Sequence, residues 1–510
     1  MPHLARESSV ALSFIDKCTV SGIEIHLNLA LAANSSWGRQ STSRSSQRRK
    51  ILISWSRAGR DREVVRRRVI RLSDPRITNV RVLDLRFPTS RQQIGSDSVN
   101  TDPNYSAAYC ILETDVGVEG YGLAFTLGHG TELCVLALEY LSRFLKGRNL
   151  SSVTDDTVAF SRQLTEDSQF RWLGPEKGVI HLAAAALINA VWDLYARTEG
   201  KPLWKLLAGF EPEQIVRSID FKYIEDAITP DEALDLLRTR AASQAERLRR
   251  LEQHGYPAYT TSAGWFGFSD DKIRRLCRES LSQGWTHFKL KVGGNPADDL
   301  RRARLVRAEI GPHNKLMMDA NQKWGIIEAI QRTRELAEVV PWWMEEPTSP
   351  DDILGHARIR REASPVRIAT GEHCHNRVMF KQFMQAGAMD VCQIDSCRVA
   401  GVNENLAVLL MAAKFNIPVC PHAGGVGLCE CVQHLAIFDY LRVSASLENR
   451  VTEFVDHLHE HFADPARIAN GHYLLPEKPG YSTEILPETL LAYQYPDGPV
   501  WNDHRISVVT

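Results

Sequence analysis

The stretch FKLKVGGNPADDLRRARLVRAEIGPHNKLMMDA, residues 288–320, shows the pattern that decides the fold. Two short apolar runs, 288–292 and 316–319, flank a segment, 297–310, in which apolar residues recur at helical spacing. The alternation continues, with apolar runs at 342–345, 367–370, 391–395 and 417–420 and amphipathic stretches at 326–340 and 402–415. Strands that alternate with helices of this length predict βαβ units and a parallel sheet. At least six such units over roughly 240 residues favour an α/β fold of the (β/α) barrel type.

The part of the chain before the barrel has a different order of elements. Strand-like runs at 80–83 and 108–112 come first, and a long helical stretch with apolar residues from Val179 to Leu194 follows them. Strands and helices that are segregated in this way indicate a separate α+β domain.

Composition places the chain among globular enzymes. Of its 510 residues, 44% are apolar and 24% are charged, which excludes disordered and fibrous classes. The net charge of −1 gives no overall field that would attract nucleic acid or a membrane surface. The longest apolar stretch, Leu182 to Leu194, contains Asn189 and Asp193 and is shorter than the ~20 residues of a membrane span. We therefore expect neither a nucleic-acid partner nor a membrane.

Positive charge is concentrated at the N-terminus. Residues 1–76 contain 15 Lys and Arg against 6 Asp and Glu. Three interpretations stay open: a disordered basic extension, a mitochondrial transit peptide, or a segment that is absent from the mature protein. The early acids Glu7, Asp16 and Glu24 fit a transit peptide only loosely. The sequence leaves a mitochondrial and a cytoplasmic location undecided.

Carboxylates stand at the ends of three consecutive predicted strands. Asp319, Glu345 and Glu372 are separated by 26 and 27 residues, one βα unit each. The carboxyl ends of all barrel strands meet on one face, where barrel enzymes carry their active sites. Like charges packed together are costly unless a cation neutralises them, and all-oxygen ligands suit a hard ion. The spacing predicts a Mg²⁺ site, although each carboxylate taken singly is more often a helix cap or a surface group.

Basic side chains are predicted on the same face. Alternation along a strand puts Lys289 and Lys291 on one side of their strand, and Asp395 and His422 end two later apolar runs. Singly, each residue has an ordinary structural explanation: a solvated strand end for the lysines, or a histidine satisfied beside a glycine turn. Their joint occurrence at the ends of consecutive units favours an active site.

Several segments carry a resemblance to a known family: FKLKV at 288–292, DANQ at 319–322, EEPTSP at 345–350, TGEH at 370–373, QID at 393–395 and PHAGGVG at 421–427. Together they resemble the enolase superfamily, in its mandelate racemase branch, and within that branch the L-fuconate dehydratases. The likeness extends to FPTS at 87–90, RWLGPEK at 171–177, YPAYTTS at 256–262 and EFVDHLH at 453–459. Later segments resemble the eukaryotic mitochondrial members.

The resemblance implies a modified (β/α)7β TIM-like barrel with an N-terminal α+β capping domain. On this basis we expect four parts: an extension at 1–76, the capping domain at 77–212, the barrel at 213–455 and a segment at 456–510 that returns to the cap. The likeness also implies a homo-oligomer and a small acid-sugar substrate.

Roles for individual residues follow from the same resemblance. Asp319, Glu345 and Glu372 would bind Mg²⁺, Lys291 would be the base that removes the C2 proton, and His422, paired with Asp395, would be the general acid. The expected substrate contacts are Lys289, Glu372, His422 and Glu453 in the barrel and Gly95, Ser96, Asp97, Tyr105 and Trp172 in the cap.

The chemistry makes sense of these residue types. Removal of a proton next to a carboxylate creates an enediolate with two negative charges, which a metal ion and an ammonium group stabilise. A lysine acts as base only when its pKa is lowered, and we expect Lys289 and Mg²⁺ to lower the pKa of Lys291 by like-charge repulsion. An imidazolium held by a carboxylate could then donate a proton to the departing 3-hydroxyl.

The expected reaction is dehydration of L-fuconate to 2-keto-3-deoxy-L-fuconate. Dehydration of another aldonate and racemisation at the α carbon share the same first step, so the barrel motifs do not separate them. A non-catalytic protein that contacts nucleic acid through its basic N-terminal segment is the alternative from another class.

Overall fold

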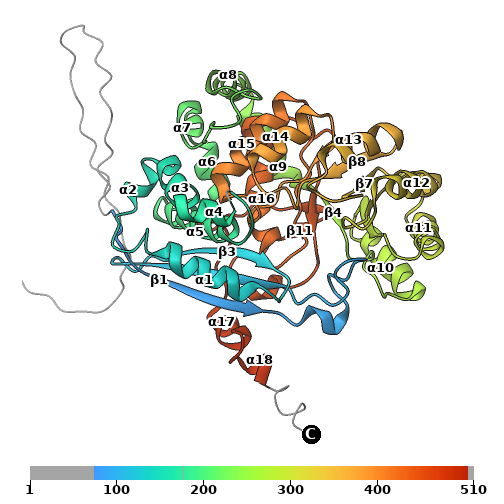
Figure 1. The fold of residues 1–510 in the computed structure, drawn as a ribbon, viewed down its shortest axis with the longest axis horizontal. Helices are drawn as coiled ribbons and strands as arrows, with labels where there is room; N and C mark the ends of the chain where they lie inside the picture. The colour runs from blue at the N-terminus through green and yellow to red at the C-terminus, as the bar shows by residue number, and fades with distance from the viewer. Residues whose placement is uncertain (1–73, 175, 503–510) are drawn as a thin grey trace, which may run out of the picture. The chain divides into compact units, whose positions relative to one another are not determined.

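The computed structural model describes residues 74–174 and 176–502 (Figure 1). The predicted basic extension therefore lies, up to residue 73, outside the described residues. The described chain comprises a three-stranded antiparallel sheet with its helices, a closed parallel sheet surrounded by helices, and a C-terminal segment.

The closed sheet is the predicted barrel. Its strands are β4 (Tyr256–Thr260), β5 (His287–Lys291), β6 (Lys315–Asp319), β7 (Trp343–Glu345), β8 (Arg367–Thr370), β9 (Val391–Cys392) and β10 (Thr452–Phe454). Each of them pairs in parallel with the next from β4 to β9, and β10 pairs in parallel with β4. A parallel bridge from Cys392 to Val419 and a hydrogen bond from the Glu453 amide to the Pro421 carbonyl close the ring. Residues 419–421 thus take the place of the remaining barrel strand, between β9 and β10.

Helices alternate with these eight barrel strands, residues 419–421 included. They are α10 (Asp270–Ser282), α11 (Pro296–Ile310), α12 (Ile326–Leu336), α13 (Ile353–Glu362), α14 (Arg377–Gln385), α15 (Gly401–Lys414) and α16 (Leu428–Phe438). The helix predicted at 326–340 ends earlier, because the chain tightens into a 3₁₀ turn at Ala337–Val339. Within the described residues this order of strands and helices is the (β/α)7β barrel that the resemblance implied.

Local sequence explains where α11, the helix of the opening stretch, begins. The Asn295 side chain accepts hydrogen bonds from the amides of Ala297 and Asp298, and Pro296 stands at the first helical position, where no amide is needed. Ala303, Val306 and Ile310 are buried on one side of the helix. The helix therefore starts directly after β5 and carries the chain back along the outside of the barrel.

The barrel interior is layered. An apolar cluster is formed by Tyr259, Met317, Trp343, Ala369, Val391, Cys420 and Val451. Because side chains two residues apart on a strand point the same way, Met317 and Trp343 place Asp319 and Glu345 one layer higher on the same side. The polar layer thus rests on a packed apolar floor at the carboxyl ends of the strands.

The N-terminal sheet consists of β1 (Ile77–Arg86), β2 (Ser106–Thr114) and β3 (Gly120–Thr126), with antiparallel pairs β1–β2 and β2–β3. The helix α5 (Gly178–Thr198) lies against it. A Cβ atom at Gly122 would come within 2.1 Å of the Ala186 carbonyl oxygen, so only glycine allows this approach. α5 is apolar and long enough to span a membrane, but most of it is buried inside the protein, as expected of a core helix.

The remaining elements lie within the cap, between the cap and the barrel, and after the last barrel strand. They are α1 (Thr131–Ser142), α2 (Ser151–Thr154), α3 (Thr157–Thr165), α4 (Ser168–Leu173), α6 (Leu203–Ala208), α7 (Pro212–Arg217), α8 (Pro230–Ala241), α9 (Gln244–His254), a 3₁₀ turn at Thr89–Gln92, a π-helical turn at Asp439–Val443, a 3₁₀ turn at His459–His461, β11 (Ile468–Ala469), β12 (His472–Tyr473), α17 (Pro487–Tyr493) and α18 (Pro499–Asn502).

The C-terminal segment runs from the barrel to the cap. β12 pairs antiparallel with β4 of the barrel. Farther on, Tyr109 of β2 donates a hydrogen bond to the Thr483 carbonyl, and the Tyr495 amide donates to the Asp84 carbonyl of β1. Figure 1 shows α17 and α18, in red, beside β1 of the cap sheet. The last described part of the chain thus contacts both sheets.

A buried charge network joins the cap to the barrel. Glu404 of α15 contacts His181 of α5 at 2.8 Å and Arg377 of α14 at 3.1 Å. Arg377 also reaches Glu176 at 3.0 Å and Asp220 at 3.4 Å. Burial raises the pKa of Glu404, but its contacts with His181 and Arg377 lower the pKa to about 2. These charges are mutually neutralised only while the cap and the barrel stay together.

Replacement of Arg377 by alanine should lower the free energy of unfolding by about 3–5 kcal/mol, because it leaves buried carboxylates without their partner. Thermal melting of Arg377→Ala against the unchanged protein measures this loss. Arg361→Ala is the control, since that side chain is 69% exposed and lies 3.6 Å from Glu362. Equal shifts for the two variants would show that the network contributes nothing beyond a surface charge.

Candidate active site

Three carboxylates meet at the carboxyl ends of β6, β7 and β8. Asp319 and Glu345 are direct neighbours in the sheet register, and Glu372 follows β8 by two residues. One oxygen atom of each carboxylate lies within 4.8 Å of the others, and all three side chains are buried. The structure therefore brings together the three acids that the sequence spacing predicted.

The chemistry of this cluster fits a hard divalent cation. Burial raises the pKa of Glu345, and the negative charges of Asp319 and Glu372 raise it further against the opposing effect of Lys289. Glu372 Oε2 is buried and makes no hydrogen bond. Buried carboxylates that repel one another and retain a free oxygen form the donor set that Mg²⁺ prefers.

Both predicted lysines point into this cluster from β5. Lys291 Nζ lies 2.6 Å from Asp319 Oδ2. Lys289 Nζ contacts Glu453 at 2.7 Å, Glu345 at 3.0 Å and Asp319 at 3.5 Å. Alternation along the strand thus places the two amines on the same side, as predicted.

The electrostatics of Lys291 differ from the expectation of a lowered pKa. Burial lowers the pKa of Lys291 and so does Lys289, but the carboxylates around it, Asp319 first and then Asp97 and Glu372, together raise the pKa above its usual value. The expected lowering came from the neighbouring lysine and a bound cation, whereas the contact with Asp319 depends on the tertiary structure. Among the protein groups alone, the surrounding carboxylates favour the protonated amine of Lys291.

The imidazole of His422 lies next to Glu372. His422 follows the barrel strand at residues 419–421, which is not adjacent to β5, the strand that carries the two lysines. Its Nδ1 lies 2.7 Å from Asp395 Oδ2, and its Nε2 lies 3.4 Å from Glu372 Oε2. Burial lowers the pKa of His422, but Glu372 and Asp395 together raise the pKa to about 9. Asp395 is itself held by the amides of Cys397 and Arg398. A protonated imidazole at neutral pH can serve as a proton donor.

Glu453, at the centre of β10, connects the two sides. It accepts hydrogen bonds from the Thr261 hydroxyl at 2.7 Å and the Ala423 amide at 2.9 Å. Its carboxylate also lies 2.7 Å from Lys289 and 3.9 Å from His422 Nε2. Burial raises the pKa of Glu453, but Lys289 and His422 hold the pKa well below its usual range.

The cap loop lies over this end of the barrel. The Ser96 carbonyl accepts a hydrogen bond from the Phe266 amide, after β4, and the Ser98 hydroxyl donates to the Ala320 carbonyl, after β6. Asp97 is buried within the same loop and holds its turn through the amides of Val99 and Asn100.

Gly95 and Tyr105 form the inner side of this loop. Gly95 has a φ of +80°, and a Cβ atom there would lie 2.5 Å from the Tyr105 ring. Tyr105 is buried, and its pKa is raised by burial and by the charge of Glu453. The structure thus places Tyr105 beside the polar layer and Gly95 directly behind it.

Trp172 is placed differently from the expectation that it would close over the substrate. The side chain is 92% exposed on α4, and the described contacts join it to none of the predicted site residues. Phe170 of the same helix packs on Tyr140 with ring centroids 4.7 Å apart. Residues two apart on a helix lie on nearly opposite sides, so the packing of Phe170 turns Trp172 to the outside.

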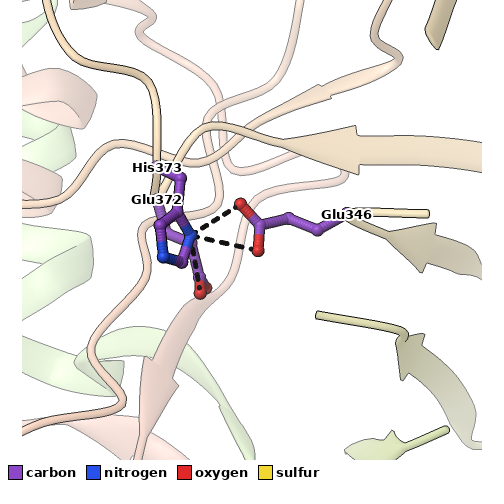
Figure 2. Close-up of side chains that lie close together, drawn as sticks. All are labelled: Glu346, Glu372 and His373. Atoms are coloured by element: carbon purple, nitrogen blue, oxygen red, sulfur yellow. Dashed lines mark hydrogen bonds and ion pairs between the residues drawn. The ribbon is translucent and has the colours of Figure 1, made fainter. Parts of the chain in front are cut away.

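A second group of side chains behind the carboxylates was missed by the sequence reasoning. His373 Nδ1 lies 2.9 Å from Glu346 Oε1 and 3.4 Å from Glu372 Oε1, and Figure 2 shows these three side chains turned toward one another. Gln322 donates a hydrogen bond to Glu346 at 2.7 Å. Each of these side chains comes one to three residues after one of the three acids. This closeness in sequence to a predicted metal ligand was the feature that could have identified them.

The backbone at this second group is strained. The backbone φ angles are 45° at Asn321, 64° at Gln322 and 40° at Glu346, values that residues other than glycine rarely adopt. Such conformations cost about 1–3 kcal/mol each and persist where surrounding contacts enforce them. The pairing of Gln322, Glu346 and His373 supplies those contacts and links the loops after β6, β7 and β8.

Comparison with known proteins identifies the family. Residues 80–208 match the mandelate racemase / muconate lactonizing enzyme N-terminal domain, and residues 272–489 match the enolase C-terminal domain-like family. Human mitochondrial enolase superfamily member 1 is 56% identical over 430 residues, which cover 84% of this chain and 97% of that protein. Its crystal structure superposes with a TM-score of 0.84 at 55% identity, over 84% of this chain and 98% of that one.

Two further relatives are informative. L-galactonate dehydratase of Hypocrea jecorina is 52% identical over 430 residues, covering 83% of this chain and 95% of that protein. L-talarate/galactarate dehydratase of Salmonella typhimurium LT2, solved with Mg and L-lyxarohydroxamate, is 22% identical with a TM-score of 0.64. That alignment covers 85% of this chain and 96% of the other, and it shows a shared fold.

Replacement of Glu346 by glutamine should weaken divalent-cation binding about 10- to 100-fold, in the range seen when outer partners of metal ligands are changed. The variant removes a negative charge and frees His373 from its pair beside Glu372, and both changes disfavour a cation. Titration with Mn²⁺ followed by electron paramagnetic resonance measures the affinity. Asp351→Asn is the matched control, because this 72% exposed acid pairs with His375. Unchanged Mn²⁺ affinity in Glu346→Gln would contradict the supporting role.

Proposed function

The chain belongs to the mandelate racemase and muconate lactonizing enzyme family of the enolase superfamily, and we propose on this premise that it is a Mg²⁺-dependent acid-sugar dehydratase. The observation that carries the proposal is the order of groups around the carboxylates. Lys291 contacts Asp319 on one side, and His422, held by Asp395, faces Glu372 on the other. A base and an acid on two sides of an anion-stabilising centre suit removal of an α proton followed by loss of a β hydroxyl.

The proposed ligands of the cation are Asp319, Glu345 and Glu372. When bound, the ion would supply positive charge that offsets the three carboxylates, two of which, Asp319 and Glu372, raise the pKa of Lys291. The same charge would stabilise the charge that develops on the substrate carboxylate. The L-talarate/galactarate dehydratase of the same fold, which was solved with Mg, supports the identity of the metal.

The side chains then divide the reaction between them. Lys289 binds the substrate carboxylate, and the neutral amine of Lys291 takes the proton from C2. His422, in its protonated form, gives a proton to the 3-hydroxyl as the C3–O bond breaks and water leaves. The resulting enol becomes the 2-keto-3-deoxy acid when its O–H group loses a proton and C3 gains one. The His422 imidazole, neutral after water has left, can take up a proton again and deliver it to C3. Glu453 holds Lys289 in position and faces the acid.

L-fuconate is the proposed substrate, converted to 2-keto-3-deoxy-L-fuconate and water. L-galactonate is a specific second candidate, because a relative of 52% identity is named L-galactonate dehydratase. The two acids have the same configuration at C2 to C5 and differ only at C6, which is a methyl group in L-fuconate and a hydroxymethyl group in L-galactonate. The catalytic groups act at C2 and C3, so the choice belongs to contacts with the far end of the chain.

The location and assembly are proposals as well. The relatives named mitochondrial enolase superfamily member 1 and the basic residues 1–76 support a mitochondrial protein. Because barrels of this branch usually assemble, we also propose a homo-oligomer.

A panel of aldonates with and without Mg²⁺ tests the function directly. We expect keto-acid formation from L-fuconate, less or none from acids with another configuration at C2 or C3, and none after chelation of the metal. A higher kcat/KM for L-galactonate would assign the second substrate. Exchange of the α proton without keto-acid formation would instead support a racemase, and activity on no aldonate would reject the proposal.

Two variants separate the proposed base from the proposed acid. Lys291→Ala should abolish both keto-acid formation and exchange of the C2 proton with deuterated water. His422→Asn should abolish keto-acid formation but retain exchange, because Lys291 is intact. Mn²⁺ titration should show that both variants still bind the cation. Near-full turnover by Lys291→Ala would refute the assignment of the base.

A further inference from the structure

His457 is a buried polar side chain near the site that the proposed reaction does not use. It follows β10, four residues after Glu453, and its side chain is only 10% exposed. Neither Nδ1 nor Nε2 makes a hydrogen bond. Asp456 Oδ1 lies 3.9 Å from Nδ1, which is within the range of a loose ion pair but too long for a hydrogen bond.

The ring belongs to an aromatic wall that leads to the proposed base. The His457 ring centroid lies 5.5 Å from that of Tyr105 in the cap and 6.4 Å from that of Trp265, which follows β4. The Trp265 ring in turn lies 5.5 Å from Lys291 Nζ. Tyr105 is packed against Gly95 of the cap loop and contacts Phe125 edge-on with centroids 5.2 Å apart. His457 therefore contacts an aromatic ring from the cap and one from the barrel, and the barrel ring, Trp265, lies next to Lys291.

An imidazole buried in this way is energetically unfavourable without a partner. A buried donor or acceptor that lacks a hydrogen bond costs about 1–3 kcal/mol, and native proteins retain few of them without a reason. A neutral imidazole offers one donor and one acceptor, which match a hydroxyl group. The aromatic rings beside it offer apolar surface for the C–H groups of a polyol chain.

The position of the wall indicates which part of a substrate it contacts. In the proposed reaction Lys289, Lys291 and His422 act on C1 to C3 of an aldonate. C4 to C6 must therefore extend from C3 toward the surfaces around these side chains, one of which is the aromatic wall. We propose that His457 binds a hydroxyl group of the substrate beyond C4 and thereby determines which acid sugar the enzyme accepts. This inference rests on the proposed function and adds the residue that selects the substrate.

The test compares substrates of two lengths in one variant. His457→Phe keeps a ring in the wall but removes both nitrogens. With the preferred six-carbon aldonate, kcat/KM should fall about 10- to 100-fold, mainly through KM, because a buried hydrogen bond is lost. With a four-carbon aldonate of the same configuration at C2 and C3, kcat/KM should stay within about twofold of the unchanged enzyme. Glu460→Gln, a 70% exposed neighbour, is the control for disturbance of the loop.

Conservative variants identify the nitrogen that binds. The amide nitrogen of Asn reaches the position of Nδ1, and that of Gln approaches the position of Nε2, so one of His457→Asn and His457→Gln should restore part of the lost affinity. Thermal melting and Mn²⁺ titration establish that all variants are folded and hold the cation. Equal losses with both substrate lengths, or no loss with either, would overturn the assignment of His457 while the proposed function stands. Failure of the unchanged enzyme to bind or convert any aldonate would reject both.

Discussion

Repulsion between three buried carboxylates is the constraint on which the site depends. Asp319, Glu345 and Glu372 present oxygens within 4.8 Å of one another in a buried environment, where like charges interact strongly. The chain offsets this repulsion with amines on one side and an imidazolium on the other. The lysines and the imidazole that neutralise the cluster also lie where they could exchange protons with a molecule bound to it. Electrostatic tolerance and chemical capacity therefore arise from the same arrangement.

The barrel makes such an arrangement possible. Parallel pairing fixes the strand ends at one face, and the apolar floor of Met317, Trp343 and their neighbours leaves each acid little freedom to move away. Behind the acids, Glu346 and His373 hold the loops in strained conformations. A rigid frame is required because charges that repel one another would otherwise move apart.

The cap supplies what the barrel lacks. In the proposed reaction the barrel groups act near C1 to C3 of the substrate. The loop at Gly95 to Ser98, Tyr105 and the ring of His457 come together only because the cap is held against the barrel through Arg377 and Glu404 and through the C-terminal segment. With the role proposed for His457, selection of the substrate depends on contacts between parts of the chain that are far apart in sequence.

The sequence by itself determined the alternation of strands and helices, the three carboxylates at 26- and 27-residue spacing, and the paired lysines, because these follow from local periodicity and from the common face of parallel strands. Tertiary structure alone decided the strands β11 and β12, the outward position of Trp172, the raised pKa of Lys291 and the lack of hydrogen bonds at the His457 ring. Each of these depends on which distant groups come into contact, through packing, hydrogen bonding or charge, and no periodicity within a segment encodes such a contact.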